Sequence, residues 1–294
     1  GNMSWRITRI ETGRVRVVDA RGQTPSIPFW LGEAPGRTTE LSEEVSRLRA
    51  EIEPLLSSRE QAVAWVMTTL STSREVADTL VAYFAATHAA LGCLPTRRRI
   101  VAERFFDEAG GMQLIIHAPL GSRLNRAWGL ALRKRFCRTF DFELQAAATD
   151  DGILLSLGPQ HSFPLDSIFH FVPARDARSI LEQAALQAPL FATRWRWVTT
   201  RALAVLRFSG GQRVAPYLIR MRAEDLLAAV FPEQAGCQDN HAGPTEIPDH
   251  PLVNQTIADC LLEAMDFPGL KRVLEGMEAG AFTMVARDTP ETSP

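Results

Sequence analysis

Residues 99–140 read RIVAERFFDEAGGMQLIIHAPLGSRLNRAWGLALRKRFCRTF, and a change of hydrophobic period within them decides the fold class. The runs Arg99–Phe106 and Met112–His117 flank Gly110-Gly111, which is the pattern of a β-hairpin. From about Ser122 to Phe140, apolar residues recur instead at helical spacing. A hairpin followed directly by a long helix favours an α+β fold over alternating βαβ units.

Short hairpins and helices continue on both sides of this stretch. Further hairpins are predicted at residues 5–20 and at 144–157, the second around Asp150-Asp151. The predicted helices are one that begins at a cap on Thr39 and others at residues 58–70, 73–91, 175–187, 190–208, 215–231, 250–266 and 267–279. The remaining predictions are loops at 25–36 and 232–251, a strand at 282–286 and fraying at 288–294.

The predicted fold class is therefore α+β, mainly helical, with winged-helix-like modules, short antiparallel β-hairpins and a small sheet. We expect three parts. Residues 1–95 form an N-terminal hairpin plus helices, and residues 96–174 form β-hairpins with a basic helix. Residues 175–294 form a C-terminal helical subdomain with an acidic tail.

The overall composition is that of an ordinary soluble globular protein. Of 294 residues, 46% are apolar and 22% charged, and no apolar run approaches the roughly 18 residues of a membrane span. The opening Gly1-Asn2-Met3 lacks the pattern of a signal peptide, and four widely spaced cysteines match no disulfide framework. We expect a cytoplasmic protein that does not bind membranes.

The net charge of −2 conceals a strong asymmetry along the chain. Residues 97–138 contain nine Arg and one Lys against three acids, and residues 194–222 contain seven Arg and no acid. Residues 223–294 carry a net charge of −10. A basic middle indicates a surface for a polyanion, whereas the alternative is that these arginines are merely solvated.

Two helical faces are candidates for that surface. On the helix at 122–140, the basic residues gather away from the apolar stripe, where they could follow a phosphate backbone. They are Arg123, Arg126, Arg133 and Lys134. We expect Trp128 in the core, because it belongs to the apolar stripe.

The second face carries Arg194, Trp197 and Arg201 at positions i, i+3 and i+7 of a helix. Two guanidinium groups around an indole could hold phosphates and stack a base. In the alternative, Trp197 packs inside and the arginines pair with acids of a neighbouring helix. We expect the adjacent Trp195 to be a core residue.

Motifs for metal or nucleotide chemistry are weak or missing. Cys237, His241, His250 and Cys260 are of zinc-binding types, but their spacing lacks the close pairs of structural zinc sites, and we predict no metal. The sequence contains no phosphate-binding loop for ATP and no serine-hydrolase or zinc-protease motif. We expect no cofactor in this chain and no catalysis from it alone.

Several long motifs resemble the Lhr (large helicase-related) family of superfamily 2 DNA helicases. The motif sequences are most similar to those of the subgroup of ligase-associated DEXH-box helicases. The motifs are SIPFWLGEAPGR at 26–37, VAERFFDEAGG at 101–111, IHAPLGSRLNRAWGLAL at 116–132, FATRWRW at 191–197, AEDLLAAVF at 223–231, IPDHPLV at 247–253 and DTPE at 288–291.

The resemblance implies the C-terminal DEAD/H-associated region, with winged-helix-like and β-barrel-like parts that line the path of the tracking strand. It implies a bacterial, nucleoid-associated repair helicase that moves 3′ to 5′ on single-stranded DNA or RNA:DNA hybrids. ATP and magnesium would bind RecA-like motor domains outside this chain, and a DNA ligase or nuclease is a further candidate partner.

Two alternatives stay open. One is an enzyme similar to winged-helix DNA glycosylases, although their Gln-x-Gln signature is absent here. The other is a protein-docking role for the acidic tail.

Overall fold

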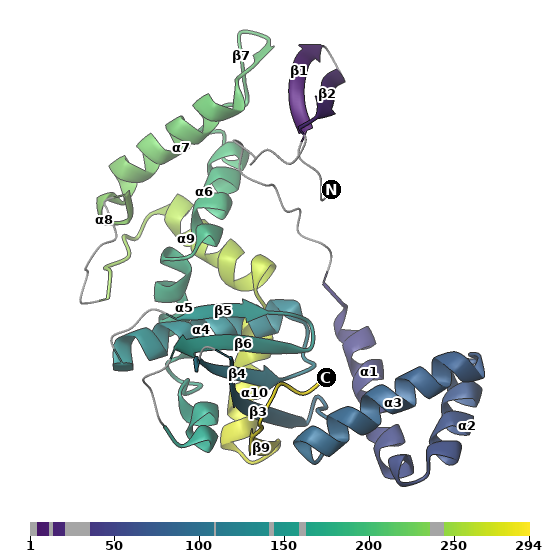
Figure 1. Ribbon diagram of the computed structural model, residues 1–294. Coiled ribbons are helices and arrows are strands. Elements are labelled where there is room, and N and C mark those ends of the chain that lie inside the picture. The colour runs from purple at the N-terminus through teal and green to yellow at the C-terminus, as the bar shows by residue number, and fades with distance from the viewer. Residues whose placement is uncertain are drawn as a thin grey trace. The chain divides into compact units, whose positions relative to one another are not determined.

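The computed structural model describes residues 5–11, 14–20, 36–108, 110–140, 144–158, 163–235 and 244–294 (Figure 1). The chain divides into two compact units, Gly1–Pro35 and Gly36–Pro294. In the first unit, strands β1 (Trp5–Glu11) and β2 (Arg14–Asp19) pair antiparallel, which confirms the predicted hairpin. The predicted loop at residues 25–36 lies outside the described residues except for Gly36.

The second unit is built on a five-stranded sheet with the order β5-β6-β4-β3-β9. The strands are β3 (Arg99–Phe106), β4 (Met112–His117), β5 (Gln145–Ala148), β6 (Gly152–Gly158) and β9 (Thr283–Asp288). Both predicted hairpins in this sheet are confirmed. The described strands form an open sheet and no closed barrel, and β9 pairs parallel to β3 although about 180 residues separate them in sequence.

Helix α4 (Ser122–Phe140) lies across one face of this sheet (Figure 1). Trp128 is 1% exposed, which confirms the prediction that it is a core residue. Gly129 allows the close approach, because a Cβ there would lie 3.1 Å from the Cγ2 atom of Ile153 on β6. Burying a side chain as large as that of Phe136 contributes about 1.5–3 kcal/mol. The apolar residues of α4 and of the sheet belong to the larger hydrophobic core, to which the C-terminal helices also contribute.

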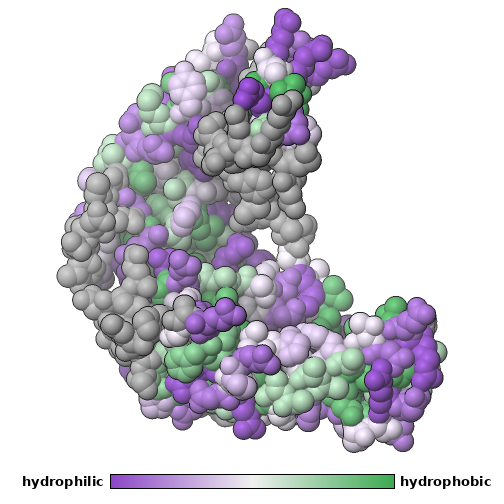
Figure 2. Space-filling view, in the orientation of Figure 1, coloured by the Kyte–Doolittle hydropathy of each residue, from purple (hydrophilic) through white to green (hydrophobic). Residues whose placement is uncertain are grey.

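Three helices form a second, smaller core. They are α1 (Thr39–Ile52), α2 (Arg59–Leu70) and α3 (Arg74–Leu91), with a 3₁₀ turn at Glu53–Ser57 after α1. Ile52, Val66 and Leu94 are buried between them. The right edge of Figure 2, where α2 and the start of α3 lie in Figure 1, is mostly hydrophilic.

The cap of α1 differs from the prediction by one residue. The Thr38 side chain, not that of Thr39, accepts a hydrogen bond from the Leu41 backbone N–H at 3.2 Å. Thr38 has the extended backbone of a cap residue, and the helix begins after it.

Two aspartates in the turn between β5 and β6 attach α1 to the sheet. The Asp150 carboxylate accepts hydrogen bonds from the backbone N–H groups of Ser122, at 2.8 Å, and Arg37, at 3.1 Å. The Asp151 carboxylate lies 3.0 Å from the Arg37 guanidinium and 3.1 Å from that of Arg49 on α1. One turn therefore joins the start of α1, the start of α4 and the sheet.

The C-terminal half is mainly helical, as predicted. It contains a 3₁₀ helix at Leu165–His170, α5 (Ala177–Leu186), α6 (Pro189–Arg201), β7 (Phe208–Ser209), β8 (Gln212–Arg213), α7 (Pro216–Val230), α8 (Pro232–Ala235), α9 (Pro251–Ala258), a π-helical segment at Asp259–Ala264 and α10 (Phe267–Glu278). No helix within the described ranges is long and apolar enough to cross a membrane.

The helix predicted at 190–208 ends seven residues early. Leu203 has a φ of 59°, in the left-handed region that ends a helix. Gly210 and Gly211, with φ of 56° and 76°, then form the tight turn of the β7–β8 hairpin. The prediction followed the apolar spacing and missed this two-glycine turn.

The prediction that residues 288–294 fray is wrong. Ser293 is 9% exposed, and its backbone N–H and its hydroxyl each donate a hydrogen bond at 2.8 Å to the Glu103 carboxylate. Thr289 donates a third at 2.8 Å, and His117 Nε2 lies 2.7 Å from Glu103 Oε2. Although burial opposes it, hydrogen bonds from His117 and Ser293 hold the pKa of Glu103 below its ordinary value.

We expect Glu103→Gln to destabilise the protein by about 2 kcal/mol near neutral pH, because an amide cannot accept all of these hydrogen bonds. Since the pKa of Glu103 is lowered by folding, its contribution is present above pH 4.5 and is lost as the pH falls below that value. Urea unfolding at about pH 7 and about pH 4 measures both effects.

The exposed Glu224 provides a matched control, Glu224→Gln. If Glu103→Gln and the unchanged protein lose equal stability between the two pH values, the carboxylate does not have this role.

Candidate nucleic-acid interface

The basic face of α4 is largely attached to the rest of the fold. The Arg123 guanidinium donates hydrogen bonds to the backbone oxygens of Leu262 and Met265, the second at 3.1 Å. Lys134 Nζ lies 2.8 Å from Gln187 Oε1, just beyond the end of α5. These two predicted site residues therefore join α4 to neighbouring segments.

Arg126 and Arg133, the other two predicted residues of this face, are half-buried. Arg133 forms no ion pair with any acid that the structure describes. Of the four basic residues predicted on α4, Arg133 thus has the clearest capacity for an external phosphate.

Helix α6 places Arg194 and Trp197 together. Arg194 is 8% exposed, and its guanidinium forms an ion pair with Glu263 at 2.9 Å. The same guanidinium stacks over the Trp197 ring, 4.7 Å from its centroid. Trp197 is nevertheless 50% exposed, so the remainder of its indole faces solvent.

Arg201, one turn further along α6, forms an ion pair with Asp259. Asp259 is 2% exposed and also accepts a hydrogen bond of 2.7 Å from Gln255. The structure therefore has the alternative arrangement for both arginines of this face, since each pairs with an acid of the π-helical segment. It brings together Arg194 and Trp197, while Arg201 serves the packing of α6.

Trp195 is a core residue, as predicted. It is 1% exposed, and its Nε1–H donates a hydrogen bond of 2.7 Å to the backbone oxygen of Ala223. The two tryptophans of the Trp-Arg-Trp motif thus have different environments, because side chains two positions apart on a helix point to nearly opposite sides.

Exposed aromatic and basic residues gather along the segment from α6 to α7; the charge count found its arginines, but sequence reasoning missed its aromatic residues. Phe208 on β7 and Tyr217 on α7 are each 62% exposed. The exposed arginines of this segment have no described acid partner and are Arg207, Arg213, Arg220 and Arg222. Interleaved rings and guanidinium groups are the chemistry of single-strand binding, which stacks bases and holds phosphates. The sequence signal was the Ser-Gly-Gly-Gln turn between Arg207 and Arg213.

Of the zinc-type residues, Cys237 and His241 lie outside the described residues. His250 Nδ1 accepts a hydrogen bond from the Leu252 N–H and caps α9, and burial raises the pKa of the Cys260 thiol to about 12. Zinc binds the thiolate, so Cys260 is poorly suited to it. Elsewhere in the described ranges, no group of three or more His, Cys, Asp or Glu could hold a metal.

Comparison with known proteins places this chain among helicase sequences. Residues 94–294 match the family described as DEAD/H associated. The Lhr helicase/probable uracil glycosylase of Mycolicibacterium smegmatis is 29% identical over 294 residues, which are 100% of this chain and 18% of that protein. The Lhr helicase/uracil glycosylase of Escherichia coli is 28% identical, again over 100% of this chain and 18% of that protein.

A solved structure is also similar. It is the helicase Lhr of Mycobacterium smegmatis bound to ssDNA and AMP-PNP, at a TM-score of 0.70 and 27% identity. The alignment covers 94% of this chain and 33% of that one. The chain thus spans between about a fifth and a third of the length of the proteins it matches.

We expect Arg201→Ala to lower the free energy of unfolding by about 1–2 kcal/mol, because it leaves buried Asp259 without a charged partner. Adding Asp259→Asn should recover part of the loss, and a double-mutant cycle in urea measures the coupling. A variant that is as stable as the unchanged protein but binds single-stranded DNA more weakly would return Arg201 to the binding surface.

Proposed function

Because this chain belongs to the DEAD/H associated family and is an accessory region of an Lhr-type helicase, we propose that it grips and guides single-stranded DNA during unwinding. The observation that carries the proposal is its likeness, over 94% of its length, to a helicase solved with ssDNA bound. In the full protein, RecA-like motor domains outside this chain would drive 3′-to-5′ movement in DNA repair.

The α6–α7 segment supplies suitable chemistry for that role. Trp197 offers an aromatic ring whose orientation is held by Arg194, and the exposed arginines offer phosphate contacts. Such a surface reads no base sequence, so binding should tolerate any sequence and weaken steeply with salt. An RNA:DNA hybrid is a second candidate substrate, because its strands carry the same phosphates.

In this proposal, ATP binds and is hydrolysed outside this chain. The sequence has no phosphate-binding loop, so we place ATP and magnesium in the motor domains and no catalysis in this chain alone. A DNA ligase or nuclease remains a candidate partner for the exposed acids of residues 223–294.

The alternative function is enzymatic: the excision of a damaged base from DNA. Two relatives carry uracil glycosylase in their names, but this chain spans only 18% of each, and its sequence has no Gln-x-Gln. Release of uracil from a uracil-containing oligonucleotide by this chain would favour that alternative.

We expect Trp197→Ala to weaken binding of oligo(dT) about tenfold, since stacking one base on an aromatic ring contributes roughly 1–3 kcal/mol. Trp197→Phe should retain part of the affinity, because a smaller ring still stacks. Fluorescence anisotropy with a labelled oligonucleotide measures both.

Tyr83→Ala is the matched control, because Tyr83 is an aromatic residue of α3 that is 44% exposed. Equal affinities for the Trp197 and Tyr83 variants would remove Trp197 from the interface. An affinity of the unchanged protein that does not vary with salt would count against strand binding itself.

A further inference from the structure

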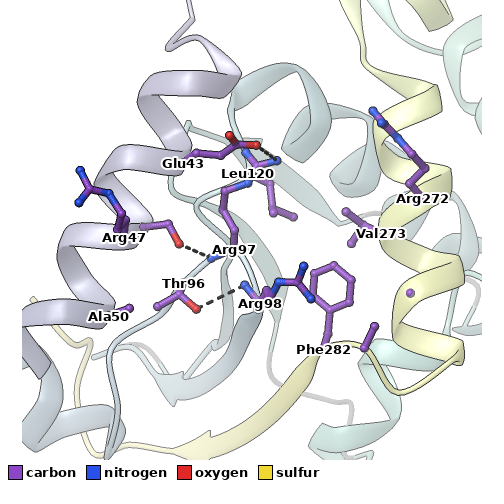
Figure 3. A pocket seen from close by; sticks show the side chains of 13 residues that line it. Glu43, Arg47, Ala50, Thr96, Arg97, Arg98, Leu120, Arg272, Val273 and Phe282 are labelled. Atoms are coloured by element: carbon purple, nitrogen blue, oxygen red, sulfur yellow. Dashed lines mark hydrogen bonds and ion pairs between the residues drawn. The ribbon is translucent and has the colours of Figure 1, made fainter. Parts of the chain in front are cut away.

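A cavity of about 690 Å³ lies between α1 and α10, away from the α6–α7 segment (Figure 3). Glu43, Arg47 and Ala50 of α1 form one wall, and Arg272, Val273 and Gly276 of α10 form the other. Between the walls are Thr96, Arg97 and Arg98, which precede β3, together with Leu120 and Phe282. We call this cavity the α1–α10 pocket.

Positive charge predominates in the α1–α10 pocket. Among the described residues that line it, four are arginines and one, Glu43, is an acid. Arg47 points outward in Figure 3 and pairs with Glu44 and Glu51, so its charge is already matched. Arg97 pairs with Glu43 at 3.8 Å, whereas Arg98 and Arg272 pair with no described acid. Cations around a concave surface favour an anionic ligand.

Arg97 has a hydrogen-bond donor that the described residues do not satisfy. Its Nη1 is buried and has no partner, and its Nη2 lies 3.8 Å from Glu43 Oε1, beyond hydrogen-bond distance. The residue is held in place because its backbone N–H donates a 2.7 Å hydrogen bond to Ser46 on α1. An unsatisfied buried donor is unfavourable, so a ligand acceptor that reaches this donor would stabilise the complex.

Arg98 and Phe282 approach each other across the base of the pocket. The backbone oxygen of Arg98 accepts a 2.8 Å hydrogen bond from Thr283, which fixes Arg98 beside the start of β9. Its guanidinium points toward the Phe282 ring in Figure 3. Arg98 and Arg272 are both exposed, and neither forms an ion pair with a described acid.

The Phe282 ring is the apolar part of the site. It is partly buried, and it lies so close to α10 that a Cβ on Gly276 would be 2.5 Å from its Cε2 atom. The absence of a side chain at Gly276 therefore permits the observed position of the ring. A planar ring beside several guanidinium groups suits a ligand with a planar base and a phosphate.

We propose that the α1–α10 pocket binds one nucleotide unit. Its phosphate contacts Arg97, Arg98 and Arg272, and its base lies against Phe282. The volume is in the range of small-ligand pockets, roughly 300–1,000 Å³. The nucleotide could belong to a DNA strand or be a free mononucleotide, because both present the same phosphate and base. Only the strand source rests on the proposed function.

The test compares the double variant Arg98→Ala/Arg272→Ala with the unchanged chain. Binding of oligo(dT) is measured by anisotropy between about 50 and 200 mM NaCl. We expect a loss of affinity of about tenfold or more, and a salt slope that is lower by about 0.7 for each lost phosphate contact. Calorimetry with dTMP and with inorganic pyrophosphate tests the free-ligand source in the same variants.

The control double variant Arg59→Ala/Arg175→Ala removes the same charge from side chains that are 67% and 86% exposed and lie outside the pocket. A loss of oligo(dT) affinity confined to the pocket variant supports the strand source. A loss confined to dTMP and pyrophosphate supports a free nucleotide. If the pocket variant binds all three probes as the control does, or the unchanged chain binds none, the proposal is overturned.

Glu43→Gln provides a test with the opposite sign. Removing the one acid among the described lining residues should strengthen pyrophosphate or oligo(dT) binding several-fold, whereas a purely structural role for Glu43 would not. Gly276→Ala must displace the Phe282 ring, so it should weaken dTMP or oligo(dT) binding and leave pyrophosphate unchanged. Absence of the increase overturns the phosphate position, and unchanged dTMP and oligo(dT) binding overturns the base position.

The two proposals fail separately. If Trp197→Ala weakens oligo(dT) binding and the pocket variant does not, the proposed strand binding stands and the pocket takes no part in it. If only the pocket variant weakens oligo(dT) binding, the pocket contacts the strand and Trp197 does not.

Discussion

The turn at Asp150-Asp151 is the constraint on which the arrangement of the larger unit depends. Its two carboxylates receive hydrogen bonds from the start of α4 and from Arg37 and Arg49, so they hold α1 against the sheet. Although burial opposes it, the hydrogen bonds from Ser122 and Arg37 lower the pKa of Asp150, which keeps it charged. Because α1 is one wall of the α1–α10 pocket, the position of that pocket follows from this turn.

The base of the α1–α10 pocket depends on a buried carboxylate, that of Glu103. Glu103 accepts hydrogen bonds from the last residues of the chain and thereby secures the end of β9, which pairs parallel to β3. Since β9 begins directly after Phe282 and fixes Arg98 through Thr283, the base of the pocket is set by the same pairing.

Sequence reasoning found the elements that depend on local periodicity. The hairpins around Gly110-Gly111 and Asp150-Asp151 and the core position of Trp128 are present as predicted. It did not find the pairing of β9 with β3 or the burial of Ser293, because both depend on contacts across more than 180 residues. For the same reason, the acid partners of Arg194 and Arg201 could not be inferred from α6 alone. Arg97 and Arg98 lie in the basic stretch that the charge count singled out, but only the fold brings them near Arg272 and Phe282.

The charge of a stretch and the number of its unmatched donors are different quantities, and the second is the better guide to a binding surface. Arg123, Arg194 and Arg201 all lie in basic stretches, yet each has its guanidinium engaged by protein oxygens. Arginine suits both uses, because its planar fork binds carboxylates and phosphates in the same way. Whether an arginine binds a carboxylate of the protein or an external phosphate depends on how many protein acceptors lie within hydrogen-bond distance of it in the folded structure. By that measure, Arg98 and Arg272 have more unmatched donors than most of the arginines that periodicity selects. A phosphate could bind Arg98 and Arg272 without breaking an ion pair, whereas a phosphate at Arg201 would have to displace Asp259.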